Sequence, residues 1–274
     1  KSVIDPHADK KSNAIEKRKV LLVEDNHELL NVLSNLFSST YEVVMAHNGK
    51  EGLDKAHEEF PDIIVSDIMM PEMTGIELCE TIKSDFNLCH IPIVLLTALA
   101  STQQNIEGLT KGADDYITKP FNTSILLVRC NNLVHNRLML QKKFQQQGYT
   151  DTEVIANNPI DQHFLDALNS VIENHIDDTE FNIDHLACAL GLSRSSLYAK
   201  FKSLTGITPN DYILSKKIKR AAHLLQSTQL QITEISDMLG FGSSRYFTRC
   251  FKKSFGIAPS EYRKKENSAE KLSE

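Results

Sequence analysis

Short apolar runs alternate with longer amphipathic stretches between residue 19 and about residue 135. Each run is flanked by polar residues, and the stretch that follows it has apolar positions at helical spacing. This alternation predicts parallel strands joined by helices that cover both faces of one sheet. We therefore expect an α/β, doubly wound sheet of five parallel strands. The expected strands are Val20–Val23, Val43–Ala46, Ile63–Val65, Ile93–Leu96 and Tyr116–Ile117.

The pattern changes beyond this region. Residues 137–159 are polar and rich in glutamine, which is typical of a helical continuation followed by a linker. From residue 160 to 265 the apolar positions keep a helical period, so an all-α domain is expected there. The predicted organisation is an upstream linker at 1–18, an α/β domain at 19–136, a linker at 137–159, an all-α domain at 160–265 and a tail at 266–274.

The all-α region contains an internal repeat. Residues 183–191 align with residues 232–240 at an offset of 49, and residues 201–212 align with residues 251–262 at an offset of 50. Each copy has the pattern of a helix, a turn at Gly191 or Gly240, and a second helix that begins after Ser193 or Ser243 as N-cap. The repeat therefore predicts two helix-turn-helix units. Their second helices are expected at about 194–204 and 244–255.

Charge divides the chain in the same way. The 274 residues carry a net charge of −6, but residues 1–159 hold 15 Lys and Arg against 22 Asp and Glu, whereas residues 191–265 hold 14 against 4. A region this basic predicts a polyanionic partner, most simply double-stranded DNA, although a solvated basic face would give the same count. The content of 41% hydrophobic and 24% charged residues is that of globular domains and excludes wholesale disorder.

Targeting and covalent signals are absent from the sequence. No window holds about 18 consecutive apolar residues, and the first 19 residues are too polar for a signal peptide, so we expect a cytoplasmic protein. The five cysteines are scattered and never spaced as CxxC, which favours neither a disulfide framework nor a zinc site. The chain begins with Lys1 instead of Met, which suggests part of a longer protein.

Polar residues that suit phosphoryl chemistry follow the predicted strands. Glu24 and Asp25 follow the first strand, Asp67 the third, Thr97 the fourth and Lys119 the fifth. In doubly wound sheets, ligands lie beyond the carboxyl ends of the strands, so these side chains are expected to converge. Three carboxylates suit Mg²⁺, and a carboxylate so placed can act as a nucleophile towards phosphorus. A positive lysine would then neutralise the phosphoryl oxygens.

These residues stand in segments that resemble the receiver domain of bacterial response regulators, a flavodoxin-like fold. The matching segments are Val23–Asn26, Ser66–Gly75, Leu95–Ala98 and Asp115–Phe121. The resemblance implies that Asp67 accepts a phosphoryl group from a histidine kinase, with Lys119 and Thr97 as the other catalytic residues. It also implies that Glu24, Asp25, Asp67 and the backbone carbonyl of Met69 hold Mg²⁺, and that Thr97 and Tyr116 form the switch.

The residues beside this site bear on its chemistry. Met69 and Leu99 lie two residues beyond Asp67 and Thr97, where they would flank an attacking water molecule, and both are apolar. We therefore predict slow self-dephosphorylation. A Mg²⁺-dependent phosphohydrolase is the enzymatic alternative, but Met69 stands where that chemistry would place a second carboxylate. The protein is accordingly not expected to be an enzyme.

The second helix of each helix-turn-helix unit is expected in the major groove of DNA. Helical spacing assigns Leu197, Phe201 and Leu204 to the core of the first unit and Phe247, Phe251 and Phe255 to that of the second. The region 160–265 resembles the DNA-binding domain of AraC-family regulators, most closely over 235–263. The resemblance implies base contacts by Ser195, Tyr198, Ala199, Ser244, Arg245, Thr248 and Arg249. Arginine suits guanine and lysine suits phosphates, so the further expected DNA contacts are Arg194, Lys200, Lys202, Lys252 and Lys253.

A helix from Pro209 to about Ser227 is expected between the two units. About 18 residues at ~1.5 Å each would span ~27 Å, which is enough to hold two recognition helices near one DNA turn apart, ~34 Å. One monomer would then read two successive major grooves.

Together, the two parts resemble the cytoplasmic end of a Bacteroidetes hybrid two-component sensor, in which sensor, kinase, receiver and DNA-binding domain share one chain. No histidine here lies in a phosphodonor motif, so the donor would lie upstream or on another protein. The expected function is phosphorylation-controlled DNA binding that activates transcription, through receiver-mediated homodimers and with RNA polymerase as a further partner. The alternative is constitutive DNA binding with the receiver as a phosphate-independent docking module.

Overall fold

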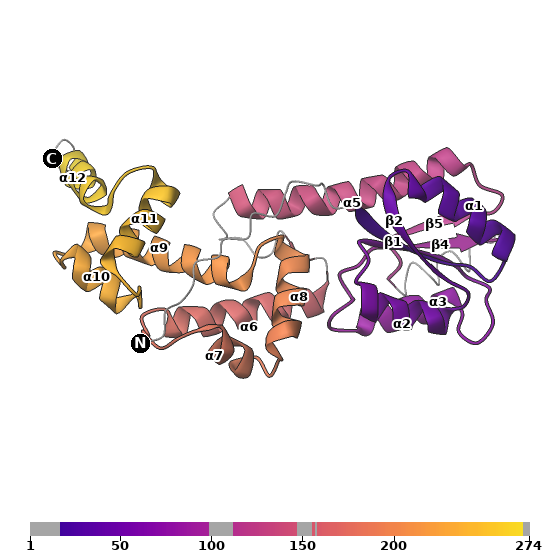
Figure 1. The fold of residues 1–274 in the computed structure, drawn as a ribbon, viewed down its shortest axis with the longest axis horizontal. Coiled ribbons are helices and arrows are strands. Elements are labelled where there is room, and N and C mark those ends of the chain that lie inside the picture. Colours follow the sequence, from indigo (N-terminus) through magenta and orange to yellow (C-terminus); the bar gives the residue numbers. More distant parts are fainter. Residues whose placement is uncertain (1–16, 99–111, 147–154, 157, 271–274) are drawn as a thin grey trace. The chain divides into compact units, whose positions relative to one another are not determined.

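The computed structural model describes residues 17–98, 112–146, 155–156 and 158–270 (Figure 1). The chain forms two compact units, of which the first comprises residues 1–82 and 91–131 and the second residues 83–90 and 132–274. This division places residues 83–90 and 132–136 with the second unit, whereas the sequence pattern assigned them to the α/β domain. Leu99 and the residues between the fourth and fifth strands up to 111 lie outside the described residues, as does part of the expected linker.

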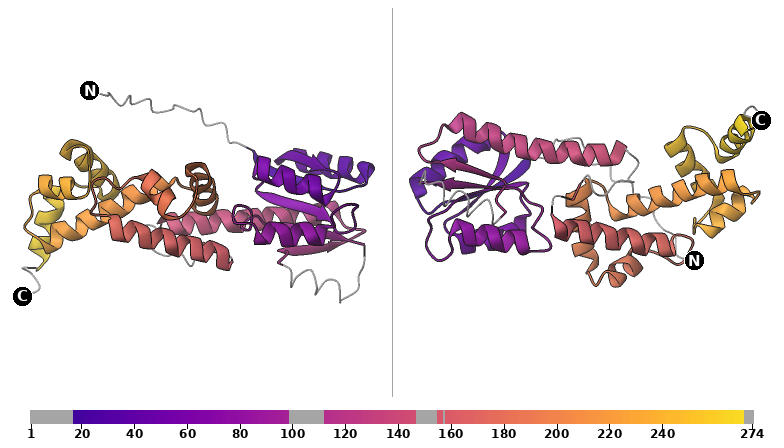
Figure 2. Two further views of the ribbon diagram at one scale, coloured as in Figure 1. Left: turned by 90° about the horizontal axis from the view of Figure 1, so that it is seen from below. Right: turned by 180° about the vertical axis from the view of Figure 1, so that it is seen from behind.

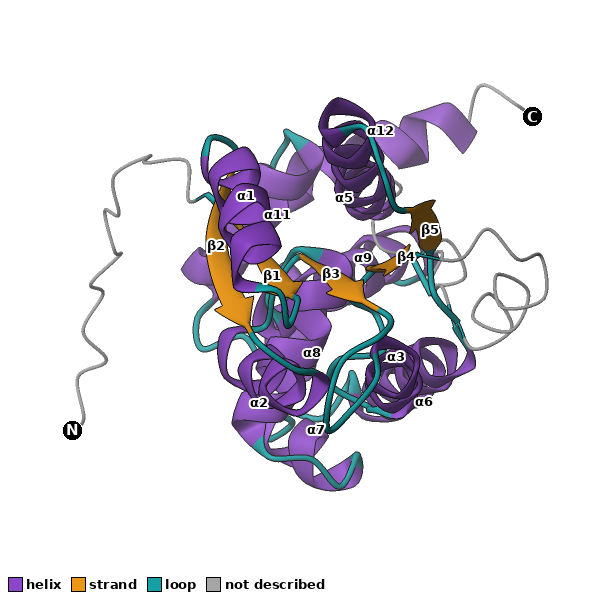
Figure 3. Ribbon diagram, turned by 90° about the vertical axis from the view of Figure 1, so that its right-hand side faces the viewer, coloured by secondary structure: helices purple, strands orange, loops and turns teal. Residues whose placement is uncertain are grey.

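The first unit is built on a five-stranded parallel sheet with the order β2-β1-β3-β4-β5. Each predicted strand is confirmed and is one to two residues longer at one or both ends. Figure 3 shows α1 and α5 on one face of the sheet and α2 and α3 on the other. The strands are β1 (Arg18–Val23), β2 (Tyr41–Ala46), β3 (Ile63–Asp67), β4 (Ile93–Thr97) and β5 (Asp115–Thr118).

The central strands are apolar because helices cover both faces of the sheet. Every residue of β3 and β4 is buried, and so are the last four residues of β1. Asn26 and Asn48 cap the first two helices by accepting hydrogen bonds from free backbone N–H groups of the first turn. The helices that cover the sheet are α1 (His27–Ser38), α2 (Gly49–Glu59), α3 (Gly75–Ser84) and the first part of α5 (Thr123–Gln146).

The second unit is helical and has two hydrophobic cores. One core gathers around Phe201 and Tyr212, and the other around Phe247 and Phe251. The long helix α9 contributes side chains to both cores. Figure 2 shows the course of this helix, in orange, in two further views. The remaining helices are α6 (Pro159–His175), α7 (Ile183–Ala189), α8 (Arg194–Thr205), α9 (Pro209–Ser227), α10 (Ile232–Met238), α11 (Ser244–Phe255) and α12 (Pro259–Glu270).

Both helix-turn-helix units form as the repeat predicts. Gly191 and Gly240 adopt positive φ angles of 66° and 65° at the turns, and Ser193 and Ser243 cap the helices that follow. One core assignment is wrong: Phe255 is 36% exposed, because it lies in the last turn of α11, where its ring packs with the rings of Phe251 and Tyr262. Among the described helices, none is both long and apolar enough to cross a membrane.

Candidate functional site

Three carboxylates meet at the carboxyl edge of the sheet. Glu24 and Asp25 follow β1, and Asp67 ends the neighbouring strand β3. One oxygen of each carboxylate lies within 4.8 Å of the other two. Glu24 and Asp67 are buried, whereas Asp25 is exposed. The sequence prediction that these strand ends converge is therefore confirmed.

Lys119 joins this cluster from the end of β5. Its Nζ lies 2.9 Å from Glu24 Oε2 and 2.9 Å from Asp67 Oδ1. Burial alone would lower the pKa of Lys119, but hydrogen bonds to the two carboxylates and their charges outweigh burial and raise it. The backbone N–H of Lys119 also donates to the carbonyl of Thr97, at 2.6 Å, which ties the ends of β4 and β5 together. The lysine is held as a cation beside the acidic cluster.

The electrostatic balance of the site favours a bound cation. Burial raises the pKa of Glu24, and the charge of Asp67 adds to this, while the hydrogen bond from Lys119 opposes it. Three carboxylates face one ammonium group, so negative charge remains in excess. Oxygen ligands of this kind are those that Mg²⁺ prefers, and exposed Asp25 leaves an open side for water ligands. The residues present therefore fit the predicted Mg²⁺ site.

The loop after β3 approaches Asp67 closely. Gly75 N–H donates to the carbonyl of Ile68 at 3.0 Å, and a Cβ on Gly75 would lie 2.0 Å from the carbonyl oxygen of Asp67. Only glycine permits this approach. Met69, within this loop, has an apolar side chain that is 67% exposed.

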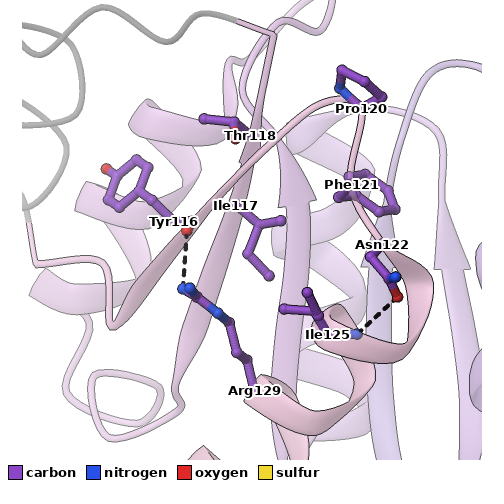
Figure 4. Close-up of a pocket in the computed structure, with 8 residues that line it drawn as sticks. All are labelled: Tyr116, Ile117, Thr118, Pro120, Phe121, Asn122, Ile125 and Arg129. Carbon is purple, nitrogen blue, oxygen red and sulfur yellow. Dashed lines mark hydrogen bonds between the residues drawn. The ribbon is translucent and has the colours of Figure 1, made fainter.

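The expected switch residues lie on adjacent strands. Thr97 is buried at the end of β4, and Tyr116 lies on β5, two register positions away. The Tyr116 hydroxyl is buried and makes no hydrogen bond within the part of the chain that the structure describes, and burial raises its pKa to about 12. Figure 4 shows Tyr116 at the edge of a pocket that also includes Phe121, Ile125 and Arg129. Arg129 donates to the Tyr116 carbonyl at 3.5 Å.

The expected recognition helix of the first helix-turn-helix unit, α8, exposes fewer cations than predicted. Ser195, Ala199 and Lys202 are exposed along α8. Arg194 is also exposed, but it forms an ion pair with Asp184 of α7, at 3.2 Å. The Tyr198 hydroxyl accepts a hydrogen bond from the Asn210 amide at 2.6 Å.

The expectation that Lys200 contacts DNA phosphates is wrong. Its side chain is fully buried, and its Nζ lies 2.5 Å from Oδ1 of Asp161 on α6, which is buried as well. The physical reason is the position of Lys200 on the flank of α8, next to the core positions. The repeat indicates that this position is not exposed, because the matching residue of the second helix-turn-helix unit is Cys250, which is not an exposed residue either.

The second helix-turn-helix unit presents a continuous basic surface on α11. Arg245, Arg249, Lys252 and Lys253 are all exposed on α11, while Ser244 and Thr248 are half-buried between them. The Arg249 guanidinium also lies 5.3 Å from the ring centre of Tyr246. Tyr246 is 41% exposed on this helix. The sequence analysis did not name it among the outward residues, although an aromatic side chain outside the core positions was a signal for it.

The class of protein follows from this geometry and from the families that match. Residues 20–131 match the response regulator receiver domain, and residues 186–265 match a helix-turn-helix domain. The chain therefore combines a region that matches receiver domains with a region that matches helix-turn-helix domains of the AraC type.

Several known proteins are similar to this chain in sequence or in structure. The chain is 39% identical over 247 residues to histidine kinase P4 of Formosa agariphila, which covers 90% of this chain and 18% of that protein. It is 40% identical over 149 residues to hybrid signal transduction histidine kinase D of Dictyostelium discoideum, covering 53% of this chain and 10% of that protein. The chain thus spans less than a fifth of these relatives. A receiver domain of a histidine kinase from Syntrophus aciditrophicus is 34% identical, covering 43% of this chain and 90% of that one, with a TM-score of 0.41.

Proposed function

We propose that transfer of a phosphoryl group from a histidine kinase to Asp67 controls sequence-specific binding of this protein to double-stranded DNA. The observation that carries the proposal is the contact of Lys119 Nζ with Asp67 Oδ1, at 2.9 Å, within a carboxylate cluster. The same chain contains α8 and α11, the second helices of its two helix-turn-helix units. The protein would act in this way as a regulator in the cytoplasm, with activation of transcription as the expected outcome.

The proposed transfer needs little beyond positioning and charge. A carboxylate oxygen of Asp67 attacks phosphorus, the P–N bond of the phosphohistidine breaks, and the released imidazole takes up a proton. Lys119 stabilises the charge on the phosphoryl oxygens. Mg²⁺, when bound by Glu24, Asp25, Asp67 and the Met69 carbonyl, supplies further positive charge for these oxygens.

The new phosphoryl group would be read by the end of β4. Phosphorylation adds nearly two negative charges, and the hydroxyl of Thr97 can donate a hydrogen bond to them. Tyr116, whose hydroxyl is buried on the next strand, would then adjust its packing. This change would favour pairing of two receivers, which places two DNA-binding domains on one DNA and raises apparent affinity without new contacts.

On the DNA side, α8 and α11 would enter successive major grooves. The side chains proposed for base edges are Arg194, Ser195, Tyr198, Ala199, Ser244, Arg245, Thr248 and Arg249, and those proposed for phosphates are Lys202, Lys252 and Lys253. The exposed cations on α11 support a stronger contribution from the second unit. RNA polymerase would be a partner of the DNA-bound protein.

Intact-mass measurement after incubation with acetyl phosphate and Mg²⁺ tests the proposal. The wild type should gain one phosphoryl group and Asp67→Asn none, while Asp54→Asn, an exposed acid on α2, serves as the matched control and should be phosphorylated. DNA affinity should rise with phosphorylation. If the wild type is phosphorylated but its DNA affinity stays constant, the receiver is a docking module and DNA binding is constitutive.

A further inference from the structure

The two helix-turn-helix units have separate hydrophobic cores that share one helix. Tyr212 and Ile213, near the start of α9, belong to the first core, and Ile218 and Leu225, further along, belong to the second. Figure 1 shows α9 running from one unit to the other. A single shared helix fixes the distance between the units, but helices bend, and the second unit could rock about α9 if nothing else held it.

A second connection exists between the units. The loop between α6 and α7 belongs to the first unit, and its Thr179 packs against the turn of the second unit at Gly240. A Cβ on Gly240 would lie 3.0 Å from Thr179 Cα and 3.2 Å from both the Thr179 carbonyl oxygen and Lys217 Nζ. Nearby, Arg220 of α9 forms an ion pair with Asp177 of the same loop, at 3.4 Å.

Lys217 completes this contact from the middle of α9. Its side chain is buried, which lowers the pKa of Lys217, although the charge of Asp178 opposes the shift. The Lys217 ammonium group lies at the turn, 3.2 Å from the position that a Cβ on Gly240 would take, and interacts electrostatically with Asp178 of the loop.

The repeat itself provides the contrast. Gly191 occupies the same position in the first unit and has nearly the same φ angle, 66° against 65°. Among the residues that the structure describes, none lies within 4 Å of the position that a Cβ on Gly191 would take. The turn of the second unit is therefore packed, while the equivalent turn of the first is open. Backbone conformation alone requires glycine at 191, whereas close packing adds a second requirement at 240.

We propose that the contact between Thr179, Lys217 and Gly240, here called the Gly240 joint, fixes the angle between α8 and α11 and so sets the spacing of the two half-sites that the DNA must present. This inference rests on the proposed DNA binding. One inserted base pair moves the second half-site by about 3.4 Å and rotates it by about a tenth of a turn. Only a rigid pair of recognition helices would discriminate against so small a change.

Duplexes selected by the full-length wild-type protein from a random pool provide the probe. Their spacing is then varied by inserting or deleting one or two base pairs between the half-sites, and binding is measured by fluorescence anisotropy. We expect the wild type to lose at least about tenfold in affinity away from one optimal spacing, comparable with a mismatched base pair. Gly191→Ala, which introduces the same left-handed strain without a clash, should keep that optimum and that loss.

Gly240→Ala should flatten the spacing profile or move its optimum, because the added methyl group displaces the Thr179 loop. Lys217→Met keeps the buried stem and removes the ammonium group, and it should flatten the profile even if Gly240→Ala does not fold. Circular dichroism establishes which variants are folded. The inference is overturned if the wild type shows no preferred spacing, or if the folded variants among Gly240→Ala and Lys217→Met keep the profile of Gly191→Ala. A wild type that selects no duplex at all refutes the proposed DNA binding itself.

Discussion

Replacing Lys200 by methionine removes one partner of a fully buried ion pair in the first helix-turn-helix unit. The other partner, Asp161, would lose the ammonium group that lies 2.5 Å from its Oδ1. Loss of one member of a buried pair costs about 3–5 kcal/mol of folding free energy, because an uncompensated charge remains in the interior. Asp161→Asn should cost about as much, since the ammonium group is then the one left unpaired.

The double variant Asp161→Asn with Lys200→Met leaves neither charge behind. We expect it to regain most of the lost stability, so the two single changes should be strongly non-additive in a double-mutant cycle. Urea unfolding of the full chain, followed by far-ultraviolet circular dichroism, measures the three variants against the wild type. Additive effects, or single variants as stable as the wild type, would refute the argument that this pair is buried and mutually dependent.

The same substitution separates a structural lysine from a DNA contact. Each lysine that neutralises a phosphate contributes about 0.9 to the slope of log affinity against log salt concentration. Lys202, two residues along α8 and exposed, should reduce that slope by about this amount when changed to glutamine. Lys200→Met should leave the slope unchanged in protein that is still folded. A reduced slope for Lys200→Met would place its ammonium group on DNA after all.

Three further predictions concern the α/β unit. Asp25→Asn should weaken Mg²⁺ binding at least about tenfold, because it removes one of three charged ligands, and calorimetric titration checks this. The acyl phosphate on wild-type Asp67 should persist for much longer than minutes at neutral pH, since the exposed apolar side chain of Met69 cannot orient water. Loss of the radiolabel within minutes would contradict this. Burial raises the pKa of Tyr41 to about 12, so the folded state favours its neutral form. Tyr41 therefore makes its full contribution to the free energy of unfolding below about pH 10, and this contribution falls by about 2–3 kcal/mol as the pH rises to 12. In urea unfolding, Tyr41→Phe should not show this fall.

Local sequence patterns predicted much of this molecule because its elements bury regular faces. The five strands follow apolar runs, and the ends of parallel strands meet at one edge, so the cluster of Glu24, Asp67 and Lys119 could be placed without coordinates. The boundaries of α11 match the prediction because Ser243 caps the helix and Gly256 ends it. These features depend on residues close together in sequence or on the topology of a known sheet type.

The remaining features depend on contacts that periodicity does not reveal. Helical spacing left Lys200 on a flank, and only the position of Asp161 on α6 decides that its charge is buried. Phe255 has the spacing of a core residue, but the helix ends before the core can cover it. The packing of Thr179 against Gly240 joins residues far apart in sequence, and nothing local distinguishes Gly240 from the open Gly191.

Selection of bound sequences from a random duplex pool tests the central claim most directly. The selection would be run with and without acetyl phosphate and Mg²⁺, for the wild type and for Asp67→Asn. The account predicts that one sequence family is enriched, that enrichment by the wild type depends on the phosphodonor, and that Asp67→Asn loses this dependence. Equal enrichment under every condition would retain the DNA-binding domain but contradict control of this chain by phosphorylation of Asp67.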